Sequence, residues 1–201
     1  MSPLLLWLAC GTPPPITATP VATAPVAEAT TAGRSWRRMN IDQLKASIQK
    51  VTGGISWTEE DGNGETDLFE ALDGTLGKPD YLSATEEDLA PGLLFQKFLD
   101  DAATSACSKL VSVDPGRSGE QRTLLVEAEL ADTPLSNPEA VEANIRAALL
   151  RFHGKMLAAG DPTVEPWKEL VYGVYDDQHD MAPAWEALCV ALIVHPDFYR
   201  Y

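Results

Sequence analysis

Residues 92–110 read GLLFQKFLDDAATSACSKL, and their hydrophobic positions recur at the three- and four-residue steps of a helix. Pro91 suits the first position of such a helix. The pattern predicts a long helix with a broad apolar face that other helices must cover. The residues of this face are Leu94, Phe95, Phe98, Leu99, Ala103, Cys107 and Leu110.

Five further segments show the same periodicity between start and stop signals. The expected starts are Asn40, Thr66, Ser136, Thr163 and Pro183, and the expected ends are Gly53, Gly77, Gly160, Val174 and His195. Residues 123–130 alternate weakly in hydrophobicity, and we favour an ordered loop there because a lone strand has no sheet to join. The sequence therefore predicts an all-α fold, an irregular bundle of about six helices over residues 35–201.

An apolar run over residues 4–9 ends at Cys10, and residues 12–31 are almost wholly Pro, Ala, Thr and Val. This pattern indicates a bacterial lipoprotein with a signal segment at 1–9, acylation of Cys10, and a disordered, lipidated Pro/Ala/Thr tether at 10–34. Only nine residues precede Cys10, none of them Lys or Arg, so a frayed apolar end with a free thiol is the alternative. The prediction is a lipid anchor in the cell envelope, in the periplasm or at the outer membrane.

The formal net charge is -15, and thirteen acidic residues lie between Glu59 and Asp101 against two lysines. We expect no nucleic-acid partner, since phosphate contacts need clustered Lys and Arg. The one basic cluster, Arg34, Arg37 and Arg38, could face anionic lipid headgroups, but a solvated domain edge explains it better. The expected partners are other cell-envelope proteins, together with the membrane that holds the lipid anchor.

Cys107 and Cys189 each lie on the apolar stripe of an expected helix. In an exported protein, two buried cysteines that remain after acylation of a third are best explained as a disulfide. Two separate buried thiols are the alternative. A nucleophilic cysteine is disfavoured, because neither position has basic neighbours that would lower its pKa.

Metal and catalytic sites have weaker support in the sequence than the disulfide has. Glu59, Asp61, Asn63, Gly64, Glu65, Asp67 and Glu70 fall at the spacing of an EF-hand calcium loop. A solvated acidic loop at 59–70 is favoured, because Glu replaces Asp at the first position and no entering helix precedes it. The segment 176–180 (DDQHD) around His179 is the other candidate, although a polar interhelical loop explains it better, and His153 and His195 have ordinary structural explanations. We predict no catalytic residue, no metal site and no cofactor; covalent c-type haem is excluded because Cys-x-x-Cys-His is absent.

Several stretches resemble helical domains of unknown function from large exported planctomycete and myxobacterial proteins, which often lie beside cytochrome c domains. The stretches are FHGK (152–155), VEPW (164–167), AWEALCVAL (184–192) and HPDF (195–198). LGKPDY (76–81) and FQKFLDDA (95–102) are similar to small stand-alone myxobacterial relatives. The resemblance implies an exported helical protein and supplies no catalytic residues. The missing haem motif is a departure from the multi-domain members.

Together these features favour a non-catalytic binding or assembly module over an enzyme. The alternative is a metal-assisted envelope hydrolase that uses the cluster near His179. A hydrolase needs a pocket in which titratable groups converge, whereas a module needs a packed bundle with an exposed apolar or acidic contact face.

Overall fold

The computed structural model describes residues 37–62, 64–76, 78 and 89–201. The chain divides into two units, Met1–Arg34 and Ser35–Tyr201, and every described residue belongs to the second. The expected signal segment, acylated Cys10 and tether therefore lie outside the described residues. Over the described part, no helix is both long enough and apolar enough to cross a bilayer.

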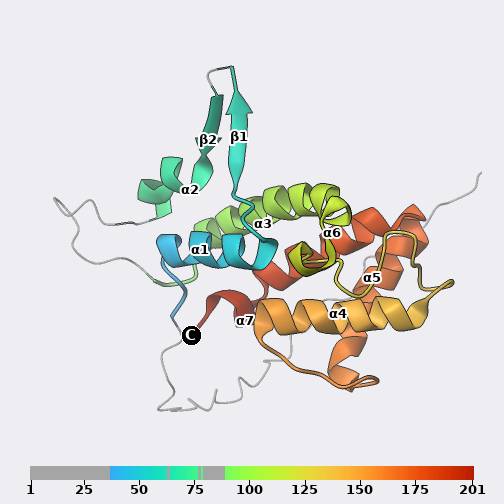
Figure 1. The fold of residues 1–201 in the computed structure, drawn as a ribbon. Coiled ribbons are helices and arrows are strands. Elements are labelled where there is room, and N and C mark those ends of the chain that lie inside the picture. Colours follow the sequence, from blue (N-terminus) through green and yellow to red (C-terminus); the bar gives the residue numbers. More distant parts are fainter. Residues whose placement is uncertain (1–36, 63, 77, 79–88) are drawn as a thin grey trace, which may run out of the picture. The chain divides into compact units, whose positions relative to one another are not determined.

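Helices dominate the described residues, which confirms the all-α fold (Figure 1). The elements in chain order are α1 (Ile41–Thr52), β1 (Thr58–Asp61), β2 (Gly64–Asp67), α2 (Leu68–Ala71), α3 (Leu93–Val113), α4 (Pro138–His153), α5 (Glu165–Gln178), α6 (Met181–Val194) and α7 (Pro196–Tyr199), with short 3-10 helices at Asp73–Leu76, Asp114–Gly116, Gly119–Gln121 and Pro162–Val164. The short helix α7 was not predicted, because His195-Pro196 reads as a stop signal. Pro196 instead takes the first position of α7, and His195 caps it by accepting a hydrogen bond from the Asp197 amide.

The core is centred on α3 and α6, which lie side by side, and α6 also contacts α4 and α5 (Figure 1). The predicted apolar faces of α3 and α6 are buried, with Leu99, Leu110, Trp185 and Leu188 fully inaccessible. Leu94 is an exception. It lies in the first turn of α3 and remains 55% exposed.

A disulfide between Cys107 and Cys189 joins α3 to α6, with a Cα–Cα distance of 5.8 Å. The two sulfurs meet because each cysteine lies on the buried face of its helix. The predicted pairing is present, and the alternative of two separate thiols is not what the structure contains.

Some helix boundaries differ from the prediction for local reasons. The cap of α1 is Asn40 as expected, in a capping box with Gln43. The cap of α4 is Asn137 rather than Ser136, whose hydroxyl is used in a turn with Thr133. Helix α4 also ends at Gly154, in the left-handed conformation with φ 67°, so it stops short of Gly160.

The same kind of shift affects the later helices. A 3-10 turn capped by Asp161 precedes α5, which begins at Glu165 rather than directly behind Thr163. Asp180 caps α6, which begins at Met181 and not at Pro183. Short acidic side chains thus take over the capping positions, because their oxygens reach backbone N–H groups two residues on.

The acidic segment 59–70 contains a β-hairpin that the sequence did not predict. Strands β1 and β2 pair antiparallel, with Glu60 opposite Glu65, and the hairpin projects from the helices in Figure 1. Its second strand ends at Asp67, whose carboxylate caps α2 in place of the expected Thr66. The expectation of a bundle without strands is wrong at this point, since helical periodicity begins only at Leu68.

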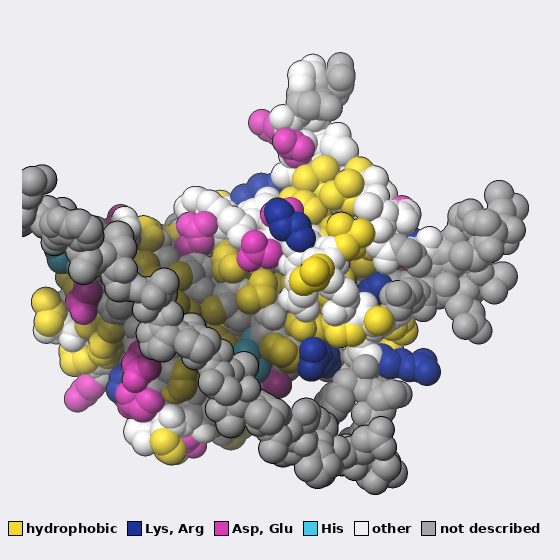
Figure 2. Space-filling model, turned by 180° about the vertical axis from the view of Figure 1, so that it is seen from behind, with side chains coloured by type: hydrophobic (Ala, Val, Ile, Leu, Met, Phe, Trp, Pro, Cys, Tyr) yellow, Lys and Arg dark blue, Asp and Glu magenta, His cyan; other side chains and the backbone are white. Residues whose placement is uncertain are grey.

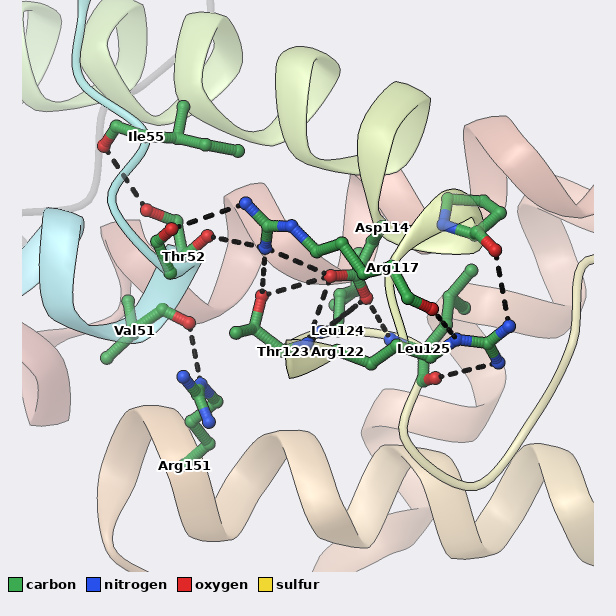
Figure 3. Close-up of polar contacts among 12 residues, drawn as sticks. Val51, Thr52, Ile55, Asp114, Arg117, Arg122, Thr123, Leu124, Leu125 and Arg151 are labelled. Atoms are coloured by element: carbon green, nitrogen blue, oxygen red, sulfur yellow. Dashed lines mark hydrogen bonds and ion pairs between the residues drawn. The ribbon is translucent and has the colours of Figure 1, made fainter. Parts of the chain in front are cut away.

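Residues 123–130 form an ordered loop, as predicted, and two buried polar side chains hold it. The carboxylate of Asp114 accepts hydrogen bonds from the amides of Thr123, Leu124 and Leu125 at 2.8–3.2 Å (Figure 3). Asn144 of α4 accepts from the amides of Val126 and Glu127 and donates to the Leu124 carbonyl. The loop therefore behaves as part of the core.

The end of α1 is attached to the same network. Arg117 Nη1 contacts both Asp114 Oδ1 at 3.2 Å and the Thr52 carbonyl at 3.1 Å (Figure 3). Arg151 of α4 donates to the Val51 carbonyl at 2.7 Å. The last carbonyls of a helix lack intrahelical partners, and these two cations satisfy them while tying α1 to the segment that follows α3 and to α4.

Candidate functional site

The acidic segment 59–70 does not form a calcium loop among its described residues. Glu59 and Glu65 lie on extended strands, and no three donors of the segment's described part converge on one point. Lys45 pairs with Asp67 at 2.9 Å and with Glu70 at 2.7 Å, so an ammonium already holds two of the expected ligands. The arrangement favours the solvated acidic segment over calcium binding.

The cluster expected around His179 is likewise dispersed. His179 ends α5 in the left-handed conformation, with φ 55°, and its side chain is exposed. Asp176 and Asp177 are exposed, and Asp180 is engaged as the cap of α6. Within the described ranges, this segment contributes no group of three potential ligands.

A different cluster forms where α4 and α6 end. His153 is the last residue of α4, and His195 and Asp197 lie at the junction of α6 and α7. One ring nitrogen from each histidine and one carboxylate oxygen of Asp197 all lie within 4.8 Å of one another. This is the one such triad in the described part of the chain.

Trp167 of α5 lines the cluster on another side. Its ring centroid lies 5.6 Å from those of both His153 and His195, in edge-to-face geometry, and the two imidazole centroids are 5.0 Å apart. His153 Nε2 lies 2.9 Å from the Leu192 carbonyl oxygen. Burial lowers the pKa of His153 below its ordinary value, so this imidazole is neutral at pH 7.

The acidic member of the cluster has a cationic neighbour. Lys155 forms an ion pair with Asp197, and the hydrogen bond from its ammonium lowers the pKa of that carboxyl. His195 Nδ1 lies 3.7 Å from the same carboxylate. An open pocket of about 430 Å³ is lined by His153, Lys155, Pro196, Asp197 and Arg200.

Sequence reasoning missed this cluster because 42 residues separate His153 from His195 and neither has a ligand at helical spacing. One local signal existed, the His-Pro-Asp run at 195–197, in which two potential ligands are two residues apart. The stretches FHGK, VEPW and HPDF, which carry the family resemblance, supply His153, Trp167, His195 and Asp197. They come together in space.

Comparisons with protein-family models, with curated proteins and with solved structures find no match to this chain. The resemblance to helical domains of exported proteins therefore stays an expectation.

Proposed function

We propose that the chain is a lipid-anchored cell-envelope protein that acts as a non-catalytic binding or assembly module. We further propose that the β1–β2 hairpin is its contact surface for a basic face of another envelope protein. The observation that carries this proposal is the set of carboxylates without a cationic partner, on both faces of a projecting hairpin.

The base of the hairpin is fixed to the core. Trp57, which precedes β1, makes edge-to-face contacts with Phe69 and Phe98 at centroid distances of 5.6 and 4.9 Å. Lys109 of α3 donates to the carbonyl and the hydroxyl of Thr58 at 2.9 and 2.6 Å. A rigidly held base presents the outer part of the hairpin at low entropic cost for binding.

The outer part carries charge that the protein does not neutralise. Glu59, Glu60 and Glu65 are exposed, and no described lysine or arginine lies within ion-pair distance of them. Glu60 and Glu65 are directly opposite across the strands, where like charges destabilise a sheet. Acidic side chains are visible along the hairpin in Figure 2. A cationic partner would relieve this repulsion, and its binding would weaken with salt.

The two-stranded sheet itself also supports a binding role. A hairpin of two four-residue strands is marginal without further contacts. Exposed strand edges offer unpaired backbone groups to a partner. Charged side chains restrict such pairing to partners of complementary charge.

The Cys107–Cys189 disulfide supports the proposed location, because structural disulfides persist mainly in oxidising compartments such as the periplasm. The alternative function is a metal-assisted envelope hydrolase centred on His179. It has less support, since the described donors around His179 are dispersed.

The test is capture of the full-length protein from its own envelope at low salt, followed by identification of the proteins that co-purify. The informative variant is the triple substitution Glu59→Gln, Glu60→Gln and Glu65→Gln. It should lose the partner and melt no lower than the wild type, because the repulsion that it removes between the opposed Glu60 and Glu65 offsets the weaker hydrogen bond that residue 65 then accepts from the Thr58 hydroxyl.

The matched control neutralises three exposed acids elsewhere, Glu120→Gln, Glu169→Gln and Asp176→Asn, and so changes the net charge equally. The control should retain the partner. A partner that binds both triple variants equally would contradict the hairpin assignment. A wild-type protein that captures nothing would contradict the binding function as a whole.

A further inference from the structure

The side-chain cluster of His153, His195 and Asp197 has the donor set of a metal site. Two imidazole nitrogens and one carboxylate oxygen lie within 4.8 Å of one another. Two histidines with one carboxylate form a common three-ligand set for zinc, which leaves a fourth position for water or a ligand. Imidazole nitrogen also favours copper, nickel and cobalt over the hard cations Mg²⁺ and Ca²⁺.

His153 is already oriented as a ligand. Its Nε2 lies 2.9 Å from the Leu192 carbonyl oxygen, an acceptor, so Nε2 carries the ring proton. The unprotonated Nδ1 is buried and has no hydrogen-bond partner among the described residues. A backbone carbonyl that holds the remote N–H is the usual outer contact of a metal-bound histidine. A metal ion at Nδ1 would also explain why this buried lone pair has no hydrogen-bond donor, a situation that otherwise costs stability.

We propose that His153, His195 and Asp197 bind one divalent transition-metal ion of the zinc class. Zinc bonds of about 2.0–2.1 Å place tetrahedral ligand atoms about 3.4 Å apart, so the cluster contracts on binding. The side chains of His195 and Asp197 can supply this movement, since they are 39% and 41% exposed. An ion bound at His195 Nδ1 replaces the hydrogen bond that this nitrogen accepts from the Asp197 amide. His153 is the fixed member of the set. The proposal does not rest on the proposed hairpin function.

Lys155 competes with the ion for the Asp197 carboxylate. Its ammonium pairs with the Asp197 carboxylate, and its side chain is 39% exposed. The ion takes over that carboxylate, and Lys155 turns to solvent. Removing the Lys155 charge should therefore strengthen metal binding, an effect that a purely structural ion pair does not predict.

The test is calorimetric titration of the full chain with Zn²⁺ in a non-chelating buffer. The wild type should bind one strong equivalent. His153→Gln, His195→Gln and Asp197→Asn should each weaken that equivalent by at least about tenfold. Lys155→Gln should bind several-fold more tightly. His179→Gln is the matched control, because it removes the third histidine of the chain, which lies outside the cluster.

A second measurement guards against variants that fail to fold. Cu²⁺ bound to the wild type should show coupling to two imidazole nitrogens in its electron paramagnetic resonance spectrum, and His195→Gln should reduce this to one. Wild-type protein that binds no Zn²⁺ would overturn the proposal. So would a folded Asp197→Asn or His153→Gln variant with wild-type affinity, because the ion would then lie elsewhere.

Discussion

Asp114 is the residue on which most of the buried hydrogen bonds of the loop depend. Its side chain is inaccessible to solvent, and it accepts from three consecutive backbone amides and from Arg117. A carboxylate is costly to bury unless its oxygens are saturated with donors. Here the donors come from a loop that has no secondary structure of its own to satisfy them.

We predict that Asp114→Ala lowers the free energy of unfolding by about 3–5 kcal/mol, because it leaves buried N–H groups and Arg117 without an acceptor. Urea denaturation measures this change. The exposed control Asp176→Ala should change stability by less than about 0.5 kcal/mol. Equal effects of the two substitutions would mean that the loop is not held by Asp114.

At the same scale, Glu142 makes the free energy of unfolding depend on pH. Its Oε1 accepts from the Gly160 amide at 2.9 Å, and Lys168 lies 3.3 Å from its other oxygen. These contacts, the amide first, lower the pKa of Glu142. The unfolded chain therefore takes up this proton at higher pH than the folded chain does. The stabilisation is present above the ordinary pKa of about 4.3 and is lost as the pH falls through the lower folded value.

The comparison is wild type against Glu142→Gln, by urea denaturation from about pH 6 to about pH 3. The stability advantage of the wild type should shrink as the pH falls. Glu169→Gln, an exposed residue of α5, should show no such trend. An advantage that stays constant over the range would rule out the lowered pKa as its source.

At the scale of elements, the hairpin combines an anchored base with an outer part that repels itself. Replacing one of the opposed carboxylates by a cation converts a repulsive cross-strand pair into an attractive one. We predict that Glu60→Lys raises stability by about 0.2–1 kcal/mol and at the same time weakens capture of the partner. Thermal denaturation and the capture experiment are run on the same preparation.

Glu60→Gln is the intermediate control, because it removes repulsion without adding attraction. It should fall between wild type and Glu60→Lys in stability. If Glu60→Lys instead destabilises the protein, the register that places Glu60 opposite Glu65 is not the one present in solution.

The elements show what the sequence could predict and what it could not. The stripes of α1, α3, α4 and α6 were predictable, because hydrophobic periodicity reflects burial directly. The hairpin was not, since its residues are acidic on both faces and give no alternation. The end of α4 was placed too late because Met156 continues the apolar spacing, although Gly154 breaks the helix and Met156 is 85% exposed.

The candidate metal cluster was beyond sequence reasoning for a related reason. The disulfide could be predicted because both cysteines lie on buried stripes and an oxidising compartment joins such thiols. His153 and His195 lie at helix ends, where periodicity carries no information about which ends meet. Only the packing of α4 against α6 and α7 brings them together.

At the scale of the whole molecule, the disulfide closes a loop across 82 residues and connects the two central helices. On the chain-entropy description, such a bridge stabilises the fold by roughly 4 kcal/mol. We predict that the double variant Cys107→Ser, Cys189→Ser melts about 10 °C lower than the wild type. Scanning calorimetry under non-reducing conditions measures the shift.

Reduction of the Cys107–Cys189 disulfide in the wild type provides the control for this melting experiment. Wild type treated with a thiol reductant should melt close to the double variant, while the variant itself should not respond to the reductant. A double variant with the wild-type melting temperature would contradict a stabilising bridge.

The most direct test of an exported, lipid-anchored module is the intact mass of the protein taken from its native envelope, with peptide mapping under non-reducing conditions. The account predicts a mature N-terminus at Cys10 that carries a diacylglyceryl group, and linked peptides containing Cys107 and Cys189. A soluble species that retains Met1, with free thiols at Cys107 and Cys189, would contradict it.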